Sequence, residues 1–218
     1  KFKEGDMVTG PLMAQSYTTM PADFFTKVPN PEIDPFTQIG ILGVTTGLTA
    51  YFGIYEVGQV KEGDIVLVSG AAGGVGALVC QLAKLKGAKV IGIAGGPEKC
   101  AVLVNEVGTD AAIDYKNQNI DEQIKIHAPD GIDIFFDNVG GEILDIALDN
   151  IRDRARIIIC GAISQYSHHD AVEGPSLYLR LAEKYARMEG FTVMHFEEHY
   201  ERASKELLDL YNQKKLNV

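Results

Sequence analysis

The sequence predicts an α/β fold in which a parallel, doubly wound sheet of six strands carries helices on both faces. Two observations predict it. From about residue 64 onward, short apolar segments alternate with segments of helical periodicity, which is the spacing of βαβ units. A glycine-rich turn joins the first strand to the first helix, as D-I-V-L-V-S-G-A-A-G-G-V-G over residues 64–76. Two halves of three strands each predict the strand order 3-2-1-4-5-6.

The strand, turn and helix of this first unit can be predicted residue by residue. Ile65–Val68 is wholly apolar and rich in β-branched residues, which suits a strand buried on both faces. After the turn, apolar residues recur at helical spacing at Val75, Leu78, Val79, Leu82 and Ala83. The turn is either structural or a phosphate site. The strand before it and the helix after it favour a dinucleotide site.

The glycines of the turn have separate predicted roles. Gly73 allows the backbone to approach a pyrophosphate, and Gly76 allows the helix to lie close to the strand. Ala71 takes the place of the first glycine of the usual pattern. The helix N-terminus offers N–H groups and the positive end of its dipole to the phosphates.

The other elements are expected in order along the chain. Further strands are predicted at Lys89–Ala94, Ala111–Asp114, 132–136, 155–160 and from Phe191 to Met194. Helices are predicted at 45–57, 98–107, 119–127, 142–151, 176–185 and 197–214. Short β segments are expected at 5–9, 16–20 and 24–28, before a proline-marked connector at 29–35.

Composition excludes several classes of protein. The net charge of −10 argues against general binding of nucleic acid or of anionic membranes. No uncharged apolar run is long enough to predict a membrane span, and the first residues lack the apolar core of a signal peptide. Three distant cysteines without a C-x-x-C motif predict neither a disulfide framework nor a zinc ribbon. These features fit a reducing, cytoplasmic location.

The residues after the second and third strands indicate which dinucleotide would bind. An NAD site usually has an acidic residue at the tip of the second strand, but Gly95 and Gly96 stand there instead. Lys99 follows one helical turn later, and Tyr115 closes the third strand. Both side chains can donate to a 2′-phosphate, so the sequence favours NADP(H). The alternative is a solvated Lys99 beside Glu98.

Two histidine pairs are candidate metal ligands. His195 and His199 match the pattern H-x-x-E-H, which holds zinc only when both histidines project from one helical face. Because His195 is expected at the end of the sixth strand, no metal site is predicted. His168 and His169 lie in a polar segment and are expected to be solvated.

Five motifs occur in order: L-T-A-Y at 48–51, A-A-G-x-V-G at 71–76, A-G-x-x-E-K at 94–99, F-D-N-V-G-G at 136–141 and C-G-A-I-S-x-Y at 160–166. Together they resemble the zinc-independent medium-chain dehydrogenases/reductases, in particular the prostaglandin and leukotriene reductases, alkenal double-bond reductases and curcumin reductases. The resemblance covers the whole chain. It implies NADPH-dependent reduction of the carbon–carbon double bond of α,β-unsaturated aldehydes and ketones.

The resemblance also implies the residues of the site. The cofactor-binding set would be Gly73, Gly74, Val75, Gly95, Lys99, Tyr115, Asn138, Cys160, Ala162, Ile163, Ser164 and Tyr166. Lys99 and Tyr115 would bind the 2′-phosphate, and residues 160–166 would flank the nicotinamide ribose. Tyr166 would be the catalytic hydroxyl, assisting the developing enolate. The alternative for Tyr166 is a loop tyrosine that contacts the cofactor or a neighbouring domain.

The same resemblance implies two domains. Residues 1–40 would be part of a GroES-like substrate domain with its connector, and residues 41–218 a Rossmann domain that binds NADP. The chain would then be the cofactor domain of a larger enzyme. Thr46 stands where many relatives have proline.

Three functions stay open at this point. They are an enone reductase, a quinone or other carbonyl reductase on the same scaffold, and a dinucleotide-binding module without catalysis. A homodimer is also expected, paired through an open edge strand from Phe191 to Met194, since that segment is apolar and has no Lys or Pro.

Overall fold

The structure is a computed structural model, and it describes residues 1–11, 13, 15–167 and 172–217. Within this part of the chain, six strands form one sheet, and every neighbouring pair in it is parallel. The spatial order is β5 (Ala111–Asp114), β4 (Lys89–Ala94), β3 (Ile65–Val68), β6 (Ile132–Asp137), β7 (Ile151–Ile159) and β8 (Arg187–Gly190). In chain order this is 3-2-1-4-5-6, so the predicted topology is confirmed.

Helical segments precede the sheet and connect its strands. The first are α1 (Pro35–Ile39) and a continuous helical stretch of η2 (Val44–Leu48), α2 (Thr49–Tyr51) and η3 (Phe52–Val57). The sheet strands are followed by α3 (Gly74–Leu85), α4 (Pro97–Val102) with η4 (Leu103–Val107), α5 (Ile120–His127) and α6 (Glu142–Asp149). The last are α7 (Leu179–Glu183), η5 (Val193–His199) and α8 (Tyr200–Asn212).

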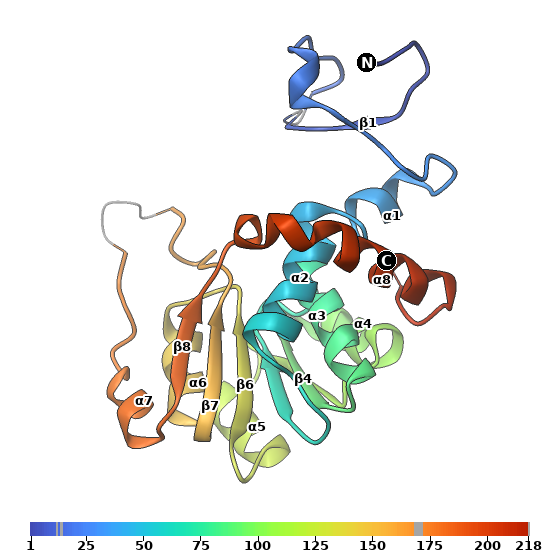
Figure 1. Cartoon of the computed structure of the whole chain (residues 1–218). Helices are drawn as coiled ribbons and strands as arrows, with labels where there is room; N and C mark the ends of the chain where they lie inside the picture. The colour runs from blue at the N-terminus through green and yellow to red at the C-terminus, as the bar shows by residue number, and fades with distance from the viewer. Residues whose placement is uncertain (12, 14, 168–171, 218) are drawn as a thin grey trace.

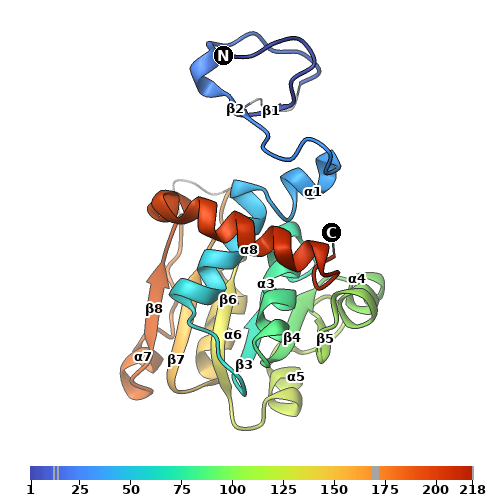
Figure 2. The same cartoon turned by 45° about the vertical axis from the view of Figure 1, so that its right-hand side comes forward.

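Helices cover both faces of the sheet (Figures 1 and 2). The side chains of β3 alternate between two cores. Val66 and Val68 pack with α2, α3 and α8 on one face, whereas Leu67 packs with α5 and α6 on the other. All three are fully buried. This confirms the predicted doubly wound fold, in which a central strand is apolar on both sides.

The N-terminal segment lies apart from the sheet in both views (Figures 1 and 2). Its β1 (Val8–Thr9) and β2 (Thr26–Lys27) form a small antiparallel pair, and η1 (Ala22–Phe24) lies between them. The predicted strand at 16–20 is wrong, since this segment finds no strand to pair with. The division into two domains at residue 40 stays a prediction.

The sixth strand is not where the sequence predicted it. The segment from Phe191 to Met194 follows β8 and leads into η5. Phe191 and Val193 are buried in the core. The rings of Phe191 and Phe136 pack edge to face, with 6.5 Å between their centroids. These apolar side chains therefore pack in the core beneath α8. The edge strand of the sheet is instead the charged segment Arg187–Gly190. The predicted dimer edge at Phe191 to Met194 is wrong for the same reason.

Three helices differ from their predicted bounds by more than one residue. The helix expected at 142–151 ends at Asp149, because Ile151 already belongs to β7. The helix expected at 176–185 is limited to Leu179–Glu183. The last helix starts at Tyr200, after the 3-10 turns of η5 with a kink at Phe196.

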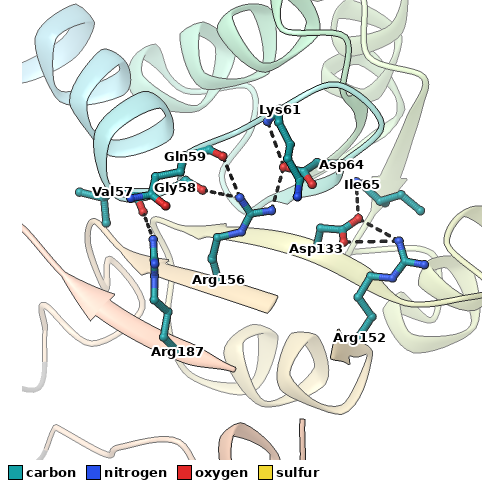
Figure 3. A network of polar contacts seen from close by, with 10 residues as sticks. All are labelled: Val57, Gly58, Gln59, Lys61, Asp64, Ile65, Asp133, Arg152, Arg156 and Arg187. Carbon is teal, nitrogen blue, oxygen red and sulfur yellow. Dashed lines mark hydrogen bonds and ion pairs between the residues drawn. The ribbon is translucent and has the colours of Figure 1, made fainter. Parts of the chain in front are cut away.

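A polar network at the amino ends of the strands ties the first helical layer to the sheet (Figure 3). Arg156 of β7 donates to the carbonyls of Gly58 and Gln59 at 2.9 and 2.8 Å and pairs with Asp64 at 2.8 Å. Arg187 donates to the carbonyl of Val57 at 2.7 Å. The two arginines thus satisfy carbonyl groups at the end of η3, which have no partner within the helix.

In the described ranges, no helix is both long and apolar enough to cross a membrane.

Candidate cofactor site

A groove of about 630 Å³ lies at the carboxyl ends of the strands. Ligands of open parallel sheets bind at this edge, near the point where the strand order reverses. Nine of the predicted site residues line the groove: Gly73, Gly74, Val75, Gly95, Lys99, Tyr115, Asn138, Ile163 and Ser164. They come from the segments that follow five of the strands, β3 to β7.

The glycine-rich turn between β3 and α3 forms the centre of the groove. Gly70 has φ of +58°, so the left-handed position of this turn falls one residue before Ala71. That explains why alanine is accepted at 71, where the usual pattern has glycine. The turn is fixed because the Ala71 N–H donates to the Ile93 carbonyl and the Gly73 N–H to the Gly70 carbonyl, both at 3.0 Å.

Helix α3 begins at Gly74 with Gly73 as its N-cap, and no side chain caps its first turn. The N–H groups of a first turn have no partner within the helix, and here they open onto the groove. Gly76 shows why small residues are needed. A Cβ at Gly76 would overlap the Gly70 carbonyl oxygen and lie 2.8 Å from the Ala71 Cα.

The far end of the groove is bordered by positive and hydroxyl groups. Lys99 lies in the first turn of α4, and Tyr115 directly follows β5. Tyr115 lies against Gly95 at the tip of β4, since a Cβ at Gly95 would lie 2.8 Å from the Tyr115 ring. Both Lys99 and Tyr115 therefore border the part of the groove where the sequence analysis expects a 2′-phosphate.

The loop after β6 is held by a buried carboxylate. Asp137 is fully buried and accepts from the Ser69 hydroxyl at 2.7 Å and from the N–H groups of Val139 and Gly140 at 2.9 and 3.0 Å. Burial raises the pKa of Asp137, and these hydrogen bonds oppose that change. The Asn138 amide donates to the Ser69 carbonyl at 2.7 Å, which fixes Asn138 at the groove.

The loop after β7 contacts this β6 loop. The Ile163 N–H donates to the Asn138 carbonyl at 3.1 Å, and the Ser164 hydroxyl donates to the Val139 carbonyl at 2.6 Å. Ile163 and Ser164 thereby reach the groove wall.

Three predicted residues of the β7 loop do not line the groove: Cys160, Ala162 and Tyr166. Burial, together with the charge of Asp137, raises the pKa of the Cys160 thiol to about 11. Tyr166 is 54% exposed, and its hydroxyl accepts from the Ala162 N–H at 3.3 Å. This bond leaves the phenolic proton free to be donated.

The comparisons with known proteins agree with this geometry. Residues 74–210 match the family model described as zinc-binding dehydrogenase. This match covers more than half of the chain. The chain belongs to the zinc-binding dehydrogenase family.

Relatives within the zinc-binding dehydrogenases confirm the predicted subgroup. The chain is 41% identical to a 2-alkenal reductase (NADP(+)-dependent) of Nicotiana tabacum over 92% of this chain and 58% of that protein. It also resembles the structure of CurA from Vibrio vulnificus in complex with NADPH, with a TM-score of 0.81 and 37% identity over 88% of this chain and 59% of that chain. The structure of the Escherichia coli quinone oxidoreductase complexed with NADPH is also similar, with a TM-score of 0.76 and 26% identity over 90% of this chain and 59% of that chain.

The chain spans 56% to 64% of the length of four curated relatives that it matches.

In the part of the chain that the structure describes, no three His, Cys, Asp or Glu side chains gather to hold a metal ion. His195, which was expected at the end of the sixth strand, lies in η5 together with His199, and His195 Nδ1 accepts from the Thr192 N–H at 3.4 Å. His168 and His169 lie outside the described residues.

Several residues that line the groove were not predicted from the sequence. Lys116, Val139 and Ile143 line the groove. A second hollow of about 520 Å³ adjoins it and shares Tyr115, Val139, Ile143 and Ser164 with it. Lys116 and Val139 could have been predicted to line the groove, because each follows the carboxyl end of a strand. Ile143 lies inside α6 and carries no such signal.

Proposed function

We propose that this chain is the cofactor-binding part of an NADPH-dependent reductase. Its reaction would reduce the carbon–carbon double bond of α,β-unsaturated aldehydes and ketones by hydride transfer. The observation that carries the proposal is the groove itself, in which an uncapped helix N-terminus, Lys99 and Tyr115 line one hollow. The names of the 2-alkenal reductase and of the NADPH complex support it.

The residues present fit a dinucleotide. A pyrophosphate would lie against Gly73, Gly74 and Val75, where no side chain blocks the first-turn N–H groups. Gly95 leaves room that a larger residue would fill, since a Cβ there would approach Tyr115. The adenine would enter the adjoining hollow between Tyr115 and Ile143.

Selection of NADPH over NADH would come from charge. Lys99 would pair with the 2′-phosphate, and the Tyr115 hydroxyl would donate to it. Gly95 and Gly96 stand where a carboxylate would repel the phosphate. A hydrogen bond to a charged group contributes about 1.5–3 kcal/mol, or roughly ten- to a hundredfold in affinity.

When bound, the nicotinamide supplies the hydride, and the chain positions and shields it. Asn138, Ile163 and Ser164 would form the wall on this side, held in place by Asp137 and Ser69. Tyr166 would donate its phenolic proton to the carbonyl oxygen of the substrate, where negative charge develops. A small enone is the proposed substrate.

Turnover of a small enone by the complete protein tests the proposal. We expect oxidation of NADPH on addition of the enone, followed by absorbance, and a larger loss of turnover than of NADPH affinity in Tyr166→Phe. An unchanged rate in Tyr166→Phe would remove Tyr166 from the reaction. No turnover with any enone, despite tight NADPH binding, would favour a dinucleotide-binding module.

A quinone or other carbonyl reductase is the second candidate function. The similarity to the quinone oxidoreductase complexed with NADPH supports it. Parallel assays with a simple enone and a quinone separate the two, since only one of them should be turned over efficiently.

A homodimer and a cytoplasmic location complete the proposal. The edge available for pairing would be β8, which has a strand neighbour in the sheet on one side only. Sedimentation at micromolar concentration tests the dimer, and a monomer would contradict it. Cys80, Cys100 and Cys160 are free, which fits a reducing compartment.

A further inference from the structure

Lys116 lies in the turn after β5 and has no part in the proposed function so far. We infer that Lys116 is a second cationic contact for the 2′-phosphate, beside Tyr115 at the tip of β4. The inference rests on the proposed function, because it adds a specificity-determining residue to the same cofactor site.

The position of the Lys116 side chain is the first argument. Lys116 lines the groove together with Lys99 and Tyr115. A Cβ at Gly95 would lie 3.0 Å from the Lys116 Cε and 2.8 Å from the Tyr115 ring, so both side chains reach the tip of β4. The Lys116 side chain and the Tyr115 phenol therefore both lie at this glycine, and Lys99 of α4 lines the same groove.

The availability of the charge is the second argument. Among the described residues, neither Lys99 nor Lys116 has a carboxylate oxygen within 4.0 Å. By contrast, Lys84 pairs with Asp110 at 2.8 Å and Lys125 with Asp121 at 2.6 Å. The ammonium groups of the two groove lysines are thus not engaged in an ion pair within this part of the chain.

The turn that carries Lys116 is held in place by Asp114. Its carboxylate accepts from the N–H groups of Gly96 at 2.8 Å and Lys116 at 3.1 Å, and from the Asn117 amide at 2.7 Å. These bonds join the tip of β4 to the turn after β5. They also engage both carboxylate oxygens with donors of the protein, while the Lys116 side chain lines the groove.

Titrations of the 218-residue chain with NADPH and with NADH test the inference. We expect Lys116→Ala to weaken NADPH binding about tenfold and to change NADH binding less than twofold. Lys116→Arg should retain most of the affinity for NADPH. Lys61→Ala is the matched control, because Lys61 is an exposed lysine in the turn before β3, at the opposite end of the sheet.

The outcomes separate this inference from the proposed function. If Lys99→Ala weakens NADPH binding while Lys116→Ala matches the unaltered chain, Lys116 is a solvated turn lysine and the inference is wrong. If Lys116→Ala weakens both cofactors equally, its role is not specific to the 2′-phosphate, and the inference also fails. If the unaltered chain binds neither cofactor, the proposed function fails with it.

Discussion

Substitution of Gly76 by alanine should damage both the fold and cofactor binding. The added Cβ would overlap the carbonyl oxygen of Gly70 and lie 2.8 Å from the Cα of Ala71. Neither backbone atom can yield easily, because the Ala71 N–H is bonded to Ile93 of the neighbouring strand. The start of α3 must therefore move away from β3.

The magnitude follows from two opposed effects. Overfilling a tightly packed site typically destabilises a protein by 1–3 kcal/mol, and alanine returns up to about 1 kcal/mol relative to glycine in a helix. We expect a net loss of about 1–2 kcal/mol, or roughly 5 °C in melting temperature for a chain of this length. Misalignment of the first-turn N–H groups should weaken NADPH binding by at least about tenfold.

Thermal unfolding and calorimetric titration of Gly76→Ala measure the two effects. Gly190→Ala is the matched control, because a Cβ there meets only the Ile159 carbonyl oxygen at 4.0 Å. The control should stay within about 0.5 kcal/mol of the unaltered chain. Unaltered stability and NADPH affinity in Gly76→Ala would show that α3 does not depend on close contact with the turn.

Two further predictions concern the sheet. Arg156→Met should lower the free energy of unfolding by about 3–5 kcal/mol, because it leaves the buried Asp64 carboxylate without its ion pair (Figure 3). Arg152→Met removes a more exposed ion pair and should lower the free energy of unfolding by less than about 1 kcal/mol. Urea denaturation measures both variants, and equal losses would contradict this difference. Burial and the charge of Asp137 raise the pKa of Cys160 to about 11. The rate at which Cys160 reacts with iodoacetamide, measured by mass spectrometry, should therefore still rise from pH 8 to pH 10. A rate that reaches a plateau below pH 9 would contradict that pKa.

Local patterns predicted the centre of the fold well. The bounds of β3, β4 and β5 were predicted correctly, because each strand is a short apolar run bounded by turn residues. The strand order followed from the alternation of elements. Nine of the site residues that the family resemblance implied line one groove, because they follow parallel strands whose carboxyl ends share an edge.

The errors arose where tertiary contacts decide the structure. The segment from Phe191 to Met194 has the composition of a strand, yet Phe191 and Val193 are drawn into the core beneath α8. The charged Arg187–Gly190 is a strand because β7 offers it a partner, which no local pattern reveals. The role of Tyr166 rests on a motif alone and stays a prediction, since its hydroxyl accepts from the Ala162 N–H and Tyr166 is not among the residues that line the groove.

The most direct test of the account is the preference of this chain for NADPH over NADH and its dependence on Lys99. Calorimetric titration of the unaltered chain and of Lys99→Ala with both cofactors measures it. We predict tighter binding of NADPH than of NADH, by roughly ten- to a hundredfold, and loss of most of that difference in Lys99→Ala. Equal affinities for the two cofactors, or an unchanged NADPH affinity in Lys99→Ala, would contradict the assignment of the groove.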